Sequence, residues 1–126
     1  MYHISECLLD LHAAGYVHRD LKPANIMWMP SQNRWTLIDF GCAARIGSEA
    51  NAGYSLLYAA PEVVRTHIEE GSKSIIVSTA LDAWSLGVLA VELFSGKPAL
   101  RMIDGRDEVR PCCHRKSPYH LSLIHI

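Results

Sequence analysis

The sequence that decides the fold is HRDLKPAN at residues 18–25, followed by DFG at residues 39–41. The first stretch places a carboxylate (Asp20), a cation (Lys22) and a carboxamide (Asn25) within six residues, and Asp39 follows Asn25 by fourteen residues. Carboxylate and carboxamide oxygens suit Mg²⁺, which keeps several waters and binds substrate phosphates. The pattern predicts a phosphoryl-transfer site with Asn25 and Asp39 on the metal. Asp20 would hold a substrate hydroxyl, and Lys22 would neutralise charge on the transferred group.

Short apolar runs flank this site. Residues 26–29 (IMWM) and 35–38 (WTLI) are separated by the turn-rich PSQNR, which predicts a β-hairpin that brings Asn25 and Asp39 side by side. Apolar residues at helical spacing predict an amphipathic helix that ends near Ala14, because Gly15 suits a left-handed cap.

The following segments carry weaker signals. Residues 41–59 are small and polar without periodicity, which predicts a long loop, and Pro61 suits the first position of a short helix. Residues 80–94 are apolar almost all round, which predicts a helix buried on every side. Thr79 and Asp82 resemble a capping box at its start, and Gly96 marks its end.

Composition restricts the class of protein. The chain has 126 residues, 49% of them hydrophobic, with 12 Lys and Arg against 13 Asp and Glu. This indicates one globular domain with its own core and argues against disorder. The near-neutral charge predicts neither a nucleic-acid partner nor a membrane partner. A secretory signal and a membrane-spanning run are both lacking in the sequence, so a cytoplasmic location is the default expectation.

The motifs in their order resemble the signature of the eukaryotic protein kinases. HRDLKPAN is followed by DFG, by APE at residues 60–62 and by DAWSLG at residues 82–87. Lys22, two residues after Asp20, resembles the serine/threonine branch. The resemblance covers residues 1–98. It implies an α+β fold, namely an incomplete kinase large (C-terminal) lobe that is mainly helical with a short β-hairpin at the catalytic and metal loops.

The resemblance also implies a role for each matching residue. Asp20 resembles the catalytic base, Lys22 the lysine on the γ-phosphate of ATP, and Asn25 and Asp39 the Mg²⁺ ligands. Met27 matches the apolar floor under the adenine ring.

Other matching positions belong to the activation segment or to structural anchors. Arg19 resembles the arginine that receives an activation-loop phosphate, and Ser55 stands where the family usually has Thr. Asp82 stands where a first-turn helix cap would, and it also resembles the family's anchor of the 18–25 backbone; the two roles are compatible. The remaining members of this set are His18, Phe40, Gly41 and Glu62.

Several parts of a kinase domain have no counterpart in the sequence. It contains no G-x-G loop and no VAIK-like strand, and no helix supplies the glutamate partner of that strand's lysine. We therefore expect a fragment without the small lobe, inactive by itself and marginally stable, in which Glu62 needs an arginine from outside the chain. Residues 99–126 are unassigned, and their end resembles translated read-through of a cloning adapter.

The expected function is ATP- and Mg²⁺-dependent phosphorylation of Ser or Thr hydroxyls in protein substrates. Two alternatives stay open: a non-catalytic pseudokinase or partial-lobe binding module, and a small-molecule phosphotransferase that shares the Asp-x-x-x-x-Asn pattern. Lys22 and the APE triplet favour a protein substrate. The sequence does not indicate an oligomeric state.

Overall fold

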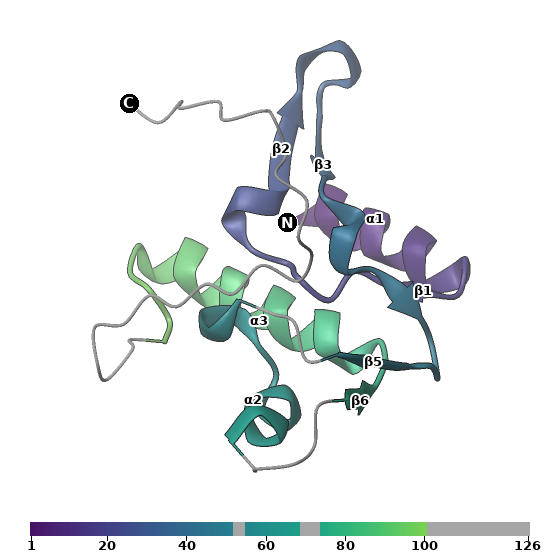
Figure 1. Cartoon of the computed structure of the whole chain (residues 1–126). Coiled ribbons are helices and arrows are strands. Elements are labelled where there is room, and N and C mark those ends of the chain that lie inside the picture. Colours follow the sequence, from purple (N-terminus) through teal and green to yellow (C-terminus); the bar gives the residue numbers. More distant parts are fainter. Residues whose placement is uncertain (52–54, 69–73, 101–126) are drawn as a thin grey trace.

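The computed structural model describes residues 1–51, 55–68 and 74–100. Their helices are α1 (Tyr2–Ala13), α2 (Pro61–Ile68) and α3 (Ala80–Ser95) (Figure 1). Short 3-10 turns are η1 (Pro23–Asn25), η2 (Pro30–Gln32), η3 (Phe40–Cys42) and η4 (Leu56–Tyr58). The strands are β1 (Tyr16–Val17), β2 (Ile26–Met29), β3 (Arg34–Leu37), β4 (Ala44–Arg45), β5 (Glu49–Asn51) and β6 (Ser74–Ile76). They form antiparallel pairs β1–β4, β2–β3 and β5–β6.

Two hydrophobic clusters hold these elements together, and α3 contributes to both. One cluster joins α1 to β3 and the far part of α3 through Ile4, Leu8, Leu21, Leu37 and Leu89. The other joins α2 to the segment around β6 and the start of α3 through Val17, Ala59, Ala60, Val63, Val77 and Leu81. In Figure 1, α3 accordingly runs between α1 with its hairpin and the part that holds α2, β5 and β6. The helix is therefore the common support of the loops described below.

The first helix and the hairpin confirm their predictions. Ile4 and Leu8 are buried on one face of α1, and Gly15 adopts the left-handed φ of +86° that a helix end favours. Strands β2 and β3 pair from Ile26 with Leu37 to Met29 with Arg34.

The loop predicted over residues 41–59 is wrong in part, because the described residues of this range include the end of η3 and all of β4, β5 and η4. Strand β4 pairs with β1 and β5 pairs with β6, each through only two or three residues. Gly47 and Val77 extend the second pair, since Gly47 N donates to Val77 O at 2.8 Å and Val77 N donates to Ser48 O at 2.9 Å. Strands this short show no alternation in sequence, so periodicity could not reveal them.

Helix α2 begins at Pro61 as predicted, but two predictions for α3 are wrong. Thr79 has helical angles and makes no capping bond with its side chain. The carboxylate of Asp82, which would make the reciprocal bond of a capping box, accepts instead from His18 N and Arg19 N. The helix is also not buried on every side, since Leu93 is 66% and Phe94 87% exposed. Its end at Gly96, with φ +65°, confirms the prediction.

Two further predictions concern the end of the assigned part and the carboxylate of Glu62. The unassigned tail falls largely on residues 101–126, which lie outside the described residues, whereas the boundary proposed at residue 98 lies just inside them and stays a prediction. Glu62 lies exposed in the first turn of α2, so its carboxylate carries no burial penalty here. None of the described helices combines the length and apolarity needed to cross a membrane.

Candidate active site

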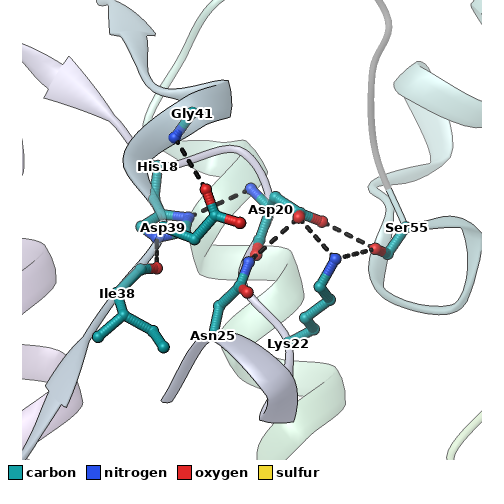
Figure 2. Close-up of polar contacts among 8 residues, drawn as sticks. All are labelled: His18, Asp20, Lys22, Asn25, Ile38, Asp39, Gly41 and Ser55. Carbon is teal, nitrogen blue, oxygen red and sulfur yellow. Dashed lines mark hydrogen bonds and ion pairs between the residues drawn. The ribbon is translucent and has the colours of Figure 1, made fainter. Parts of the chain in front are cut away.

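The carboxylate of Asp20 is the centre of a polar cluster (Figure 2). Its Oδ2 accepts hydrogen bonds from Lys22 Nζ at 2.7 Å and from Asn25 Nδ2 at 3.1 Å. Its Oδ1 accepts from Ser55 Oγ at 2.8 Å, and Ser55 Oγ in turn accepts from Lys22 Nζ at 2.9 Å. Asn25 Nδ2 also donates to the Asp20 carbonyl at 2.7 Å. The structure thus brings four predicted site residues into direct contact and fixes the direction of the carboxylate.

A buried aspartate of α3 holds the backbone next to Asp20. Asp82 is fully buried, and its two oxygens accept from His18 N and Arg19 N, each at 2.8 Å. His12 Nε2 contacts Asp82 Oδ2 at 2.8 Å as well. Arg19 has a φ of +70°, a left-handed conformation that is costly for a residue with a side chain. The buried carboxylate stabilises this turn, because bonds from two N–H groups to a charged acceptor are strong.

His18 connects the two loops of the site. Its Nε2 lies 3.1 Å from the Ile38 carbonyl, and its Nδ1 lies 3.4 Å from the Asp20 amide nitrogen. A carbonyl only accepts and an amide N–H only donates, so Nε2 is the donor and Nδ1 the acceptor in these contacts. The ring also packs against Phe40 with 5.1 Å between ring centroids. His18 therefore has a structural position between the segment before Asp20 and the segment around Asp39.

Asn25 and Asp39 lie at adjacent strand ends, as the hairpin predicts. Ile38 N donates to the Asn25 carbonyl at 3.0 Å, and Asp39 is the next residue. Asp39 adopts a left-handed conformation and its Oδ1 accepts from Gly41 N at 3.2 Å.

The donor chemistry at these strand ends fits Mg²⁺. Each of the two side chains offers an oxygen, and a magnesium ion takes its remaining ligands from water and phosphate. Within the described ranges, no group of three or more His, Cys, Asp or Glu could hold a metal by itself.

Three predicted residues have positions away from this cluster or with other partners. Arg19 Nη1 donates to the Cys42 carbonyl at 3.1 Å, and Nη2 donates to the Asn51 carbonyl, so Arg19 is bonded to the backbone of the segment after Asp39. Met27 is 42% exposed on the hairpin. Glu62 lies on α2, outside the cluster.

Sequence reasoning missed several residues that hold the site. Tyr58 OH donates to Glu92 Oε2 at 2.9 Å, and Glu92 Oε1 accepts from Ala99 N at 3.2 Å. Burial, together with the hydrogen bond and the negative charge of Glu92, raises the pKa of Tyr58 to about 12. Ser85 Oγ donates to the Tyr58 carbonyl at 2.7 Å. Ser85 lies within the DAWSLG motif, and Glu92 follows Asp82 by ten residues, but neither signal reveals which loop each one contacts.

Comparison with known proteins gives the same assignment as the motifs. The family model described as "Protein kinase domain" matches residues 1–121. The chain is 40% identical over 98 residues to the human serine/threonine-protein kinase Kist, and this alignment covers 74% of this chain and 23% of that protein. It is 32% identical over 117 residues to the mitogen-activated protein kinase KSS1 of Saccharomyces cerevisiae, covering 84% of this chain and 29% of that protein.

A solved structure extends the likeness to three dimensions. The kinase PK-1 of the Cydia pomonella granulovirus aligns with a TM-score of 0.59 and 27% identity, over 72% of this chain and 31% of that one. The chain spans about a quarter of the length of the curated relatives named above. The family match runs past residue 98, so the boundary placed there stays a prediction. Motifs, fold and relatives agree that the chain belongs to the eukaryotic protein kinase family.

Proposed function

We propose that this protein is a serine/threonine protein kinase that transfers the γ-phosphate of Mg·ATP to Ser or Thr hydroxyls of protein substrates. Residues 1–98 are assigned to the large lobe of its catalytic domain, and residues 99–126 lie outside the assigned part. The observation that carries the proposal is the Asp20 carboxylate held by Lys22, Asn25 and Ser55 beside Asp39.

The role proposed for each residue follows from the position and the chemistry of its side chain. Asp20 orients the substrate hydroxyl and accepts its proton, since its carboxylate is fixed by three donors. Lys22 lies beside that carboxylate, where its ammonium group neutralises charge on the transferred phosphoryl group. Asn25 and Asp39 would hold Mg²⁺, which would supply positive charge to neutralise the phosphate groups of ATP. Met27 supplies an exposed apolar surface for the adenine ring.

The activation segment is included in the proposal. Ser55 ties the segment to Asp20, Phe40 packs on His18, and Gly41 donates to Asp39. Arg19 holds the same segment through two carbonyls, at a place where a phosphate on that segment would find a cation. The location assigned by default is the cytoplasm.

The test is transfer of labelled phosphate from ATP by the product of the natural transcript in the presence of Mg²⁺. Protein acceptors and an amino-sugar acceptor are offered side by side. We expect label on Ser or Thr of the protein acceptor, with loss of transfer in Asp20→Ala and Asp39→Ala. Asp10→Ala is the matched control, because Asp10 is an exposed acid on α1.

Each other outcome contradicts a stated part of the proposal. Label on the amino sugar alone would replace the protein substrate with a small molecule. Nucleotide binding without transfer to any acceptor would replace the enzyme with a binding module.

A further inference from the structure

Ser85 is a buried serine of α3 whose hydroxyl reaches out of its own helix. The residue is 6% exposed, and its Oγ lies 2.7 Å from the Tyr58 carbonyl and 3.1 Å from the Leu81 carbonyl. A hydroxyl has one hydrogen to donate, and the Leu81 carbonyl already has a regular partner in the backbone N–H four residues later. The shorter bond therefore joins α3 to the backbone of η4.

The turn held in this way has Ser55 at its other end. Tyr58 N donates to the Ser55 carbonyl at 2.9 Å, which closes the turn, and the Tyr58 ring is held separately by Glu92 of α3. Ser55 Oγ then contacts both Asp20 and Lys22. A displacement of Tyr58 is transmitted to Ser55 over three residues of a closed turn.

Asp20, the acceptor of the Ser55 hydroxyl, is positioned by the same helix. Asp82 lies one turn before Ser85 on α3 and holds the backbone of His18 and Arg19, next to Asp20. One rigid helix thus sets both ends of the Ser55–Asp20 hydrogen bond.

We infer that Ser85 is a positioning residue for the Asp20–Lys22 pair. Its hydrogen bond to the Tyr58 carbonyl fixes the turn of residues 55–58 against α3, so that Ser55 Oγ reaches the side chains of both Asp20 and Lys22. The inference rests on the proposed function only in taking Asp20 and Lys22 as the groups that act on substrate.

The test measures the rate at which the Lys22 amine is acylated in the folded chain, relative to the exposed Lys97. An amine held by two oxygen atoms reacts more slowly than one held by a single oxygen atom. We expect Ser85→Ala and Ser55→Ala each to raise the Lys22 rate by about tenfold, the factor set by one hydrogen bond to a charged group. The double variant should equal Ser55→Ala, because both substitutions remove the same contact.

Two variants separate positioning from a general loss of stability. Ser5→Ala is the matched control, since Ser5 Oγ also contacts the carbonyl four residues earlier but no loop. Its Lys22 rate should equal wild type. Ser85→Thr keeps the hydroxyl, and a small cavity lined by Ala59, Ala60 and Ser85 adjoins it, so Ser85→Thr should restore the slow rate.

The inference is overturned if Ser85→Ala leaves the Lys22 rate unchanged while Ser55→Ala raises it. It is also overturned if Lys97 and Lys22 accelerate together in Ser85→Ala, since that result indicates loosening of the whole fold. The acylation rate involves neither ATP nor an acceptor. A failure of phosphate transfer would therefore contradict the proposed function without touching this result.

Discussion

Removing the buried carboxylate of Asp82 is the sharpest perturbation of the fold. Asp82 is fully buried and accepts bonds from two backbone N–H groups and from His12, all at 2.8 Å. Asp82→Ala leaves the N–H groups of His18 and Arg19 without that acceptor. An unsatisfied buried donor costs about 1–3 kcal/mol, so the two together cost about 2–6 kcal/mol.

The magnitude distinguishes this role from that of an ordinary first-turn acid. An acidic residue that only interacts with the helix dipole contributes about 0.3–1 kcal/mol. A domain of this size has a total stability of about 5–15 kcal/mol, so the larger loss removes much of it. In urea unfolding, where a small domain has a slope of about 1–3 kcal/mol per molar, Asp82→Ala should lower the midpoint by about 0.7 M or more.

Two controls make the result decisive. Asp10→Ala removes an exposed carboxylate, and Thr79→Ala removes a hydroxyl that makes no capping bond. Both should change the free energy of unfolding by less than about 0.5 kcal/mol. Unfolding of Asp82→Ala at the same urea concentration as Asp10→Ala would show that the Asp82 carboxylate does not hold the backbone of His18 and Arg19.

Other expected outcomes follow from burial and charge. The raised pKa of Tyr58, about 12 against an ordinary 10.0, means that the unfolded chain loses its phenol proton first as pH rises. Stability should therefore fall between pH 10 and about 12 in the wild type and fall less in Tyr58→Phe, measured by urea unfolding at each pH. Leu8→Ala should lower the free energy of unfolding by about 2–5 kcal/mol, because Leu8 is only 4% exposed. The neighbouring Leu9 is 67% exposed, so Leu9→Ala should lower it by less than about 0.5 kcal/mol. Equal losses would contradict the assignment of the buried face of α1. Phe94→Ser should leave the unfolding midpoint unchanged, because Phe94 is 87% exposed; a lower midpoint would show that Phe94 is packed.

Much of the fold could be predicted because its elements carry local signals. Four signals determine structure within a few residues of their own position: the apolar stripe of α1, the turn between β2 and β3, Pro61 and Gly96. Strands β4, β5 and β6 carry no such signal, because backbone hydrogen bonds to distant segments create them. Thr79 was misread for a related reason, since the partners of Asp82 lie more than sixty residues away at His18 and Arg19.

The residues of the candidate site show the same contrast between local signals and contacts with distant segments. Asp20, Lys22 and Asn25 are close in sequence, and the hairpin determines where Asp39 lies, so their proximity could be inferred. The contacts of Ser85, His12 and Glu92 depend on how α3 packs against loops that are distant in sequence. A single sequence contains no signal for that packing.

The measurement that tests the central claim most directly is phosphate transfer from Mg·ATP to a protein Ser or Thr by the natural gene product, compared between Asp20→Asn and Asp10→Asn. Asp20→Asn keeps the size of the side chain but removes the proton acceptor, and general-base catalysis contributes about 10²–10⁴-fold. We expect a loss of that size in Asp20→Asn and none in Asp10→Asn. Equal transfer by the two variants would contradict the assignment of residues 18–25 as the catalytic centre.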